Sequence, residues 1–407
     1  MLTYQTAGES HGKGIAAFID GFPSGVFIDS DYINGELKRR QGGYGRGGRQ
    51  TIETDSVEVQ TGIINGQSIG SPILLWIKNR DYKIDQMPKI EQPRPGHGDL
   101  TGSLKYLSEI RPILERSSAR ETAGRVAAGA LAALLLQEFK IQTVAYVLSI
   151  GSCFLNSFQN NDYKNNNSFN PPQKAETGND SFIESLSLEE IRKRRDQSEV
   201  YSLFPERDNE VKFLIDQCRE SGDTLGGIVE IRVFNVPFGL GTHLQWDRKL
   251  DGRLAQAIMA VQAIKGVEIG LGFDAARRFG SAVHDPIEFD ETKRHSRSLG
   301  FQRPTNNAGG IEAGMTNSNA IVLRAAMKPI ATLKKPLASV NLRTKESVSA
   351  SYERSDVCAV SATSVILENI VAFEIAAALI EKFGGDSLNE MKARFDLFHR
   401  MVSEQLA

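Results

Sequence analysis

Two histidines stand in short glycine-rich segments where a side chain could carry out acid–base chemistry. His11 lies in Gly8-Glu9-Ser10-His11-Gly12, and His97 lies in Arg94-Pro95-Gly96-His97-Gly98-Asp99. Glycine neighbours let the backbone approach a ligand closely, and histidine exchanges its proton near neutral pH. Each residue could therefore act as a general acid. Taken alone, however, each motif favours a turn histidine with a local hydrogen bond.

A third segment, Arg116-Ser117-Ser118-Ala119-Arg120-Glu121, opens the strongest predicted helix. Ser118 and Glu121 have the spacing of a capping box. The free N–H groups of a helix start suit phosphate, and arginine binds phosphate or carboxylate in a bidentate manner. An anion site is one interpretation, and an ordinary helix cap with exposed arginines is the other.

The glycine-rich loop at 41–50 carries Arg46 and Arg49 and follows Arg40. Its Gly43-x-Gly45-x-x-Gly48 spacing matches a dinucleotide-binding loop formally, but such a loop should follow a strand and open a helix. Here the order is helix, loop, strand. One copy of an RGG-like string also gives poor support for RNA binding. A basic flap over an anionic ligand fits better.

Asp356 lies in Arg354-Ser355-Asp356-Val357-Cys358, just before a predicted buried helix. A carboxylate at a helix start can be purely stabilising, because the helix dipole favours it. Cys358 is interpreted as a buried small apolar residue. The six histidines have no paired metal-ligand spacing, so no metal site is expected.

Composition limits the protein class. The 407 residues include 48 Lys+Arg and 50 Asp+Glu, giving a net charge of −2, and 40% are hydrophobic. These values are typical of a globular protein and argue against a general nucleic-acid or membrane binder. Three cysteines without CxxC spacing indicate free thiols in a reducing compartment. With no signal peptide visible at the N-terminus, we expect a cytoplasmic protein.

The hydrophobic periodicity predicts alternating groups of strands and long apolar helices. Strands are expected at Ile15–Asp20, Val57–Ile64, Ile73–Ile77, Thr143–Ile150, Val229–Val236, Val267–Ile269 and Ile321–Ala326. Helices are expected at Ser30–Arg40, Ser118–Phe139, Asp247–Ile264 and Val360–Phe383, with another opened by the Ser187-x-x-Glu190 box. The pattern suggests a layered α/β or α+β body in one domain over residues 1–407. An Asn/Ser/Pro-rich surface insertion is expected at about 153–180.

Seven segments in order resemble the chorismate synthase family. They are GESHG, RPGH, RSSARET, the stretch Gly266–Phe273, NNAGGI (Asn306–Ile311), MKPI and RSDVCAV, and they extend from Gly8 to about Glu368. Each motif is modest alone, but seven in the family's order are highly specific. The resemblance implies an α+β fold, a β-α-β sandwich with helices between two antiparallel sheets, and a homotetramer.

The same resemblance implies a carbon–oxygen lyase that needs reduced FMN. The reaction is a 1,4-anti elimination that converts 5-enolpyruvylshikimate 3-phosphate to chorismate and phosphate, the last step of the shikimate pathway. His11 would protonate the departing phosphate, His97 would maintain the protonation state of the reduced flavin, and Asp356 would assist proton transfer at flavin N5. The flavin would supply the difficult chemistry.

Further site residues are carried over by motif. FMN contacts are implied at Arg116, Ser117, Ser118, Gln262, Ala263, Ala313, Lys328, Pro329, Ile330, Ala331, Thr332 and Arg354. Arg40 and Arg46 match positions for NADP, or could hold substrate anions, and Ser10 and Arg120 match substrate contacts. Ala313 stands where a glycine is common, and Ser361 where a proline is common.

Three alternatives stay open at this point. NADPH could reduce the flavin through an activity of this chain, or an external source could do so; no appended reductase domain is visible, which favours the external source. The basic loop could bind a nucleotide or RNA, which would make binding strongly salt-dependent. An inactive scaffold relative would not need His11, His97 and Asp356.

Overall fold

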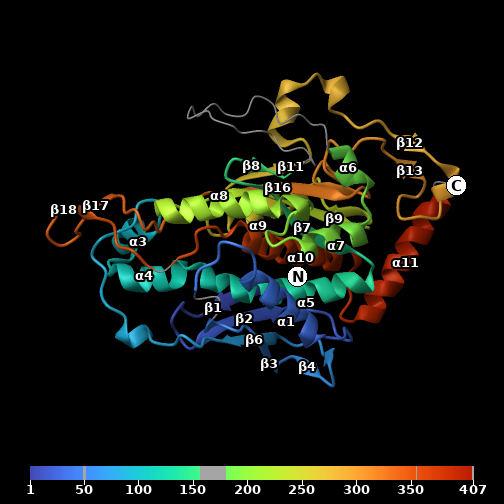
Figure 1. Ribbon diagram of the computed structural model, residues 1–407. Coiled ribbons are helices and arrows are strands. Elements are labelled where there is room, and N and C mark those ends of the chain that lie inside the picture. The colour runs from blue at the N-terminus through green and yellow to red at the C-terminus, as the bar shows by residue number, and fades with distance from the viewer. Residues whose placement is uncertain (49–51, 156–179, 354, 406–407) are drawn as a thin grey trace.

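The protein is built around two antiparallel sheets with helices between them (Figure 1). The computed structural model describes residues 1–48, 52–155, 180–353 and 355–405. The first sheet has the order β1-β2-β6-β3, with bounds Thr3–Ala7, Gly14–Asp20, Ile73–Lys78 and Val57–Thr61. The second has the order β11-β16-β9-β7-β8, with bounds Ile264–Ile269, Ile321–Met327, Gly227–Phe234, Gln142–Ile150 and Cys153–Phe154.

The helix layer contains α1 (Ser30–Gln41), α5 (Thr122–Glu138), α9 (Leu250–Met259) and α10 (Val360–Phe383). Helix α5 packs on β2 and β6 of the first sheet, and α10 packs on β7 and β9 of the second. Both helices are rich in small and apolar residues and are buried along most of their length, as a helix enclosed between two sheets must be. The expected sandwich of helices between antiparallel sheets is confirmed.

Among the described helices, α10 is the one that has the length and apolar composition needed to cross a membrane. However, 94% of its most apolar stretch is buried inside the protein. The central helix of a sandwich passes the same test of length and composition.

Other elements surround the sandwich. The helices are α3 (Asp99–Tyr106), α4 (Ile110–Ser117), α6 (Asp180–Ser185), α7 (Leu188–Gln197), α8 (Asp208–Ser221) and α11 (Leu388–Gln405). Short strand pairs are β4 (Ile63–Ile64) with β5 (Gln67–Ser68), β12 (Glu288–Phe289) with β13 (Phe301–Gln302), and β17 (Ala338–Val340) with β18 (Ser347–Ser349). A three-stranded sheet joins β10 (Phe238–Gly241), β15 (Met315–Asn317) and β14 (Ile311–Glu312).

Several expected boundaries were wrong. The predicted capping box at Ser118 does not form, because the Ser118 hydroxyl accepts from the Arg120 amide, and residues 119–121 form a 3₁₀ turn before α5 begins. The box at Ser187 and Glu190 is present. The predicted helix from 247 to 264 is shortened to α9, since Ile264 already belongs to β11.

The first residues of the predicted surface insertion belong instead to a sheet. Cys153 and Phe154 pair with β7 as the edge strand β8, and Cys153 is buried. Most of the remainder, residues 156–179, lies outside the described residues.

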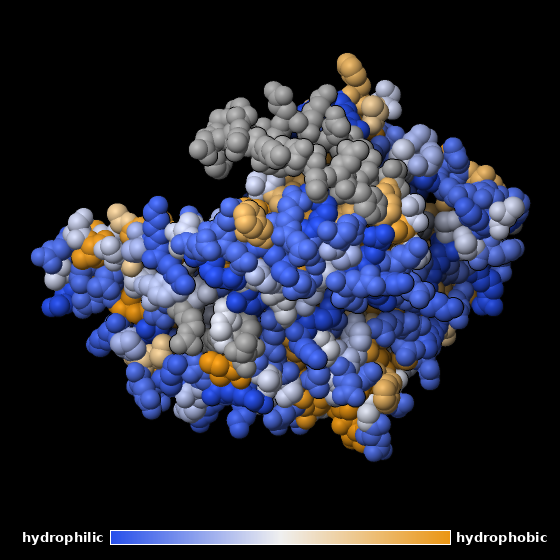
Figure 2. Space-filling model, viewed as in Figure 1, coloured by the Kyte–Doolittle hydropathy of each residue, from blue (hydrophilic) through white to orange (hydrophobic). Residues whose placement is uncertain are grey.

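The face of the molecule seen in Figure 2 is largely hydrophilic. Apolar side chains gather at its lower edge, where β4 lies in Figure 1. Large exposed apolar residues in this part of the chain are Phe27, Ile64 and Ile69.

Candidate active site

The turn that joins β1 to β2 holds His11 in a fixed orientation. The ring Nδ1 lies 2.9 Å from Glu115 Oε1, and the backbone N–H of His11 donates to Glu115 Oε2 at 2.7 Å. The other ring nitrogen, Nε2, is 3.9 Å from Asp81 Oδ2. Burial alone raises the pKa of the Glu115 carboxyl, but the hydrogen bonds from His11 outweigh burial and lower that pKa. Glu115 is therefore an ionised acceptor at neutral pH.

Asn79, directly after β6, holds the same turn from the other side. Its side-chain amide donates to the carbonyl oxygens of Glu9, Ser10 and Gly12 at 3.1, 3.2 and 2.8 Å. Its Oδ1 accepts from Arg120 Nε at 2.8 Å. One amide thus orders the backbone on both sides of His11 and connects it to the start of α5.

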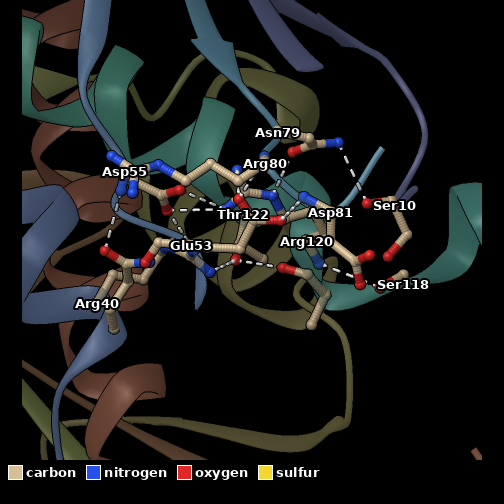
Figure 3. A network of polar contacts seen from close by, with 12 residues as sticks. Ser10, Arg40, Glu53, Asp55, Asn79, Arg80, Asp81, Ser118, Arg120 and Thr122 are labelled. Carbon is tan, nitrogen blue, oxygen red and sulfur yellow. Dashed lines mark hydrogen bonds and ion pairs between the residues drawn. The ribbon is translucent and has the colours of Figure 1, made fainter. Parts of the chain in front are cut away.

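Two buried arginines meet on Asp55 (Figure 3). Arg120 Nη1 lies 2.6 and 2.8 Å from the two Asp55 oxygens, and Arg40 Nη2 lies 2.6 Å from Oδ2. Burial raises the pKa of Asp55, but the charges of both arginines outweigh it and lower that pKa. Arg40 also donates to the Thr122 hydroxyl at 3.3 Å. Both terminal nitrogens of Arg40 are therefore engaged inside the protein.

His97 lies just before α3 and contacts the first residue of that helix. Its Nδ1 is 2.6 Å from Asp99 Oδ1. Arg94 donates to Asp99 through Nε at 2.8 Å and through Nη2 at 3.0 Å, and Nη2 is also 3.0 Å from His97 Nδ1. Burial opposes ionisation of Asp99, but these hydrogen bonds prevail and hold its pKa well below its usual value. Asp99 thus aligns both His97 and Arg94.

The loop after β16 lies against the His97 loop. The Lys328 ammonium donates to the Gly96 carbonyl, and Arg94 Nη1 donates to the Thr332 hydroxyl at 2.8 Å. Lys328 N donates to the Ala263 carbonyl at 2.9 Å. Burial, with some repulsion from Lys265, lowers the pKa of Lys328. Segments distant in sequence, at 94–99, 262–263 and 328–332, are therefore brought together.

Gln262 connects this loop cluster to the 3₁₀ turn that precedes α5. Its Nε2 donates to Glu121 Oε2 at 3.2 Å. Its Oε1 is buried, and among the described residues it has no hydrogen-bond partner. Buried polar atoms are normally paired, so this oxygen is a free acceptor for the N–H or O–H of a ligand.

The remaining residues of the Arg-Ser-Ser motif have local contacts. Arg116 donates to the carbonyl oxygens of Thr6 and Gly8 at 2.8 and 3.1 Å, so its guanidinium braces the end of β1. Ser117 Oγ is 3.4 Å from the Leu114 carbonyl. Ala313 lies in the turn between β14 and β15, and among the described residues it has no hydrogen bond to Gln262 or Lys328. Arg354, another expected contact, lies outside the described residues.

Asp356 contacts the glycine-rich loop directly. Its Oδ1 accepts from the Gly47 amide at 2.6 Å, and its Oδ2 lies 3.2 Å from Arg46 Nη1. The amides of Val357 and Cys358 donate to the Gly45 carbonyl at 2.9 and 3.2 Å. The part of the expected basic flap that is described, up to Gly48, is therefore fastened to the segment that carries Asp356.

One arginine links the His11 and Asp356 segments. Arg111 Nη2 is 2.9 Å from Glu353 Oε1, and Arg111 Nη1 is 3.8 Å from Glu115 Oε1. Sequence reasoning missed Glu115, Asn79, Asp55 and Arg111. Glu115 stands directly before Arg116 of the Arg-Ser-Ser motif, but Asn79 and Asp55 belong to no recognised motif, so the sequence offered no signal for their contacts.

A surface cavity of about 410 Å³ borders the His11 turn. Its lining includes Gly8, Glu9, Lys13, Trp76 and Tyr82, but not His11. Its lining also contains no residue of the segments 94–99, 262–263 and 328–332, so the reaction is not assigned to this cavity.

Comparison with known proteins gives one consistent result. A sequence profile described as "Chorismate synthase" matches residues 2–380. Chorismate synthases of Geobacter metallireducens and Aquifex aeolicus are each 48% identical, covering 97% of this chain and 98% and 96% of theirs. A crystal structure of chorismate synthase has a TM-score of 0.77 and 40% identity, covering 99% of this chain and 98% of that one. This chain therefore belongs to the chorismate synthase family, whose members are lyases of aromatic biosynthesis.

Proposed function

We propose that this chain performs the family reaction with the residues grouped around His11, His97 and Lys328. That reaction removes phosphate from 5-enolpyruvylshikimate 3-phosphate by a 1,4-anti elimination and gives chorismate. The observation that supports it most is the joining of three distant motif segments, through the hydrogen bonds of Lys328 to Gly96 and to Ala263 and of Arg94 to Thr332. A scaffold does not require these polar groups to converge.

The residues of the loop cluster fit a reduced flavin mononucleotide. Gln262 Oε1 is a buried acceptor that lacks a partner among the described residues, and the Lys328 ammonium is a cation for an anionic group. Residues that would hold it include Gln262, Ala263, Lys328, Pro329, Ile330, Ala331 and Thr332. Ser117 and Ser118 are included because they match the family motif. When bound, the reduced flavin supplies electron density to the substrate as phosphate leaves.

The protein's own groups then handle protons and charge. His11 donates a proton to the leaving phosphate, a role that typically contributes about 10²- to 10⁴-fold to the rate. With a reduced flavin bound, His97 would maintain its protonation state, and Asp356 would assist proton transfer at its reactive nitrogen. Ser10 contacts substrate. Arg120 acts at the site by holding Asn79 and Asp55.

For the reductant, the burial of Arg40 favours a structural role over an NADP contact. Its guanidinium is held by Asp55 and Thr122. Arg46, which is ion-paired with Asp356, remains the residue of this pair proposed for NADP or a substrate anion. We propose an external source of reducing equivalents, with NADPH as the alternative.

We further propose a cytoplasmic homotetramer that binds neither nucleic acid nor membrane and holds no metal. The exposed apolar residues Phe27, Ile64 and Ile69 support burial against another subunit. Light scattering at several salt concentrations tests the assembly. A mass near that of one 44.7 kDa chain would reject it.

The decisive experiment is anaerobic phosphate release from 5-enolpyruvylshikimate 3-phosphate, run in parallel with reduced and with oxidised FMN. We expect release, with a matching rise of chorismate absorbance, only with reduced FMN. Folded protein without release in either arm would reject the proposed activity.

The first variant for this assay is His11→Ala. We expect kcat to fall at least about a hundredfold, with FMN affinity nearly unchanged, because Glu115 and not FMN contacts this ring in our assignment. His243→Ala, at an exposed histidine outside the site, is the matched control. A near wild-type rate in the His11 variant would remove this residue from the mechanism.

A further inference from the structure

Glu115 makes two contacts to one residue. One carboxylate oxygen accepts from the His11 backbone N–H, and the other lies 2.9 Å from the ring Nδ1. The Ser10 amide also donates to the Glu115 carbonyl at 2.9 Å. The Glu115 side chain is 1% exposed and the His11 side chain 12% exposed. The carboxylate therefore fixes both the turn and the rotation of the imidazole.

We propose that Glu115 is a positioning residue that sets the His11 tautomer for the elimination, an inference that rests on the proposed role of His11. Because an ionised carboxylate can only accept hydrogen bonds, Nδ1 must carry a hydrogen. The proton that His11 donates to phosphate and later regains is then the one on Nε2. The negative charge of Glu115 stabilises the positive ring of the protonated form, as a carboxylate does in a hydrolase triad.

The charged groups that contact His11, Glu115 or Asp81 fit this arrangement. Glu115 lies on α4, and Asp81, on the loop after β6, lies 3.9 Å from Nε2. Lys83 Nζ is 2.8 Å from Asp81, which offsets part of that carboxylate's charge. Arg111 approaches Glu115 only to 3.8 Å and is closer to Glu353. Hence the strongest contact of the Glu115 carboxylate is His11 itself.

The His97 pair differs in one informative respect. Asp99 also contacts the Nδ1 of its histidine, at 2.6 Å, but it shares its charge with Arg94, which makes two side-chain hydrogen bonds to it. The guanidinium of Arg94 is itself against the His97 ring. The two carboxylate–histidine pairs therefore differ in their electrostatic surroundings. The carboxylate whose charge is less neutralised by arginine is Glu115, beside the proposed proton donor.

The test compares Glu115→Gln with Glu109→Gln. Glu109 directly precedes α4, is exposed and pairs with Lys89 at 2.6 Å, so its variant removes a nearby carboxylate without touching His11. We expect Glu115→Gln to lower kcat by roughly 10²-fold with little change in KM. We also expect the alkaline limb of its kcat profile to move to lower pH, because the protonated ring loses its counter-charge.

Recovery by a shorter acid makes the test specific. Glu115→Asp should regain part of kcat and return the pH profile toward that of the wild type. A purely structural role would instead lower the amount of folded enzyme and leave the pH profile of the remainder unchanged. Unchanged kcat and pH profile in Glu115→Gln would overturn the proposal.

A second measurement needs neither activity nor a change at Glu115. ¹⁵N-histidine NMR of the wild-type protein, with the His11 signal assigned by its loss in His11→Gln, reports which nitrogen carries hydrogen when the ring is neutral. We expect Nδ1–H, and a dominant Nε2–H form would overturn the proposal even if Glu115→Gln failed to fold. Wild-type protein without phosphate release would reject the proposed function, whereas the observed tautomer would still test whether Glu115 orients the His11 ring.

Discussion

At the scale of single residues, Ala313 occupies a backbone conformation that suits glycine. Its φ is +50°, in the turn between β14 and β15. A non-glycine residue in this left-handed region costs about 1–2 kcal/mol, partly offset by the greater freedom that glycine has in the unfolded chain. Ala313→Gly should therefore raise the free energy of unfolding by about 0.5 kcal/mol, measured by urea unfolding.

The control for this prediction is Ala338→Gly. Ala338 is an exposed strand residue with negative φ, so the same change there should be slightly destabilising. Equal effects in the two variants would show that the turn stores no strain at Ala313.

The candidate site could be predicted from sequence only where a residue belonged to a recognisable motif. His11, His97 and Asp356 were found in this way, and their roles stay predictions. Glu115 was missed because it lies 104 positions from His11 and spacing carries no information about such a contact. Arg40 was expected at an anion site, but no sequence pattern signalled that it is buried against Asp55.

At the scale of elements, the crossing of α5 and α10 depends on Gly129. A Cβ at this position would lie 2.1 Å from the backbone oxygen of Asn369 on α10. Backbone cannot move aside as a flexible side chain could, so the two helices would have to separate. Gly129→Ala should lower the free energy of unfolding by about 1–3 kcal/mol, measured as a shift in the urea midpoint.

The matched control is Gly35→Ala on α1, where a Cβ would have no atom within 4 Å. Alanine has a higher helix propensity than glycine, so this variant should gain about 0.5–1 kcal/mol. Stabilisation by both substitutions would mean that α5 and α10 are not in close contact at Gly129.

Elements with strong periodicity were predicted well, and those defined by tertiary contacts were not. The apolar pattern gave α10 its observed limits, Val360–Phe383. The helices α4, α8 and α11 were not predicted, because they are short or carry many charged residues and pack only one face. The capping box at Ser118 failed because Glu121 instead pairs with Arg125 and Thr6.

At the scale of the whole molecule, the alternation of strands and apolar helices was enough to predict a layered body, but it did not predict the order of the strands in each sheet. Which strand lies beside which follows from pairings such as β9 between β7 and β16, and these strands are separated by long stretches of chain. The resemblance, not the periodicity, supplied the sandwich arrangement. That the chain forms one domain stays a prediction.

The layers of this sandwich are joined by the ion pairs of Asp55 with Arg40 from α1 and Arg120 before α5. Because the folded-state pKa of Asp55 is lowered, its contribution to stability is complete above the unfolded value near 3.9 and is lost as pH falls through the folded value. Asp55→Asn leaves two buried guanidinium groups without their carboxylate. It should destabilise the protein by about 3–5 kcal/mol at neutral pH.

This prediction can be tested by urea unfolding at pH 7 and at several values below pH 4. The wild type should lose stability more steeply than Asp55→Asn as pH falls, because only the wild type has this carboxyl to protonate. Asp396→Asn, at an exposed carboxyl on α11, should follow the wild type throughout. Parallel pH curves for the wild type and Asp55→Asn would show that protonation of Asp55 does not drive acid unfolding and that other carboxylates govern it.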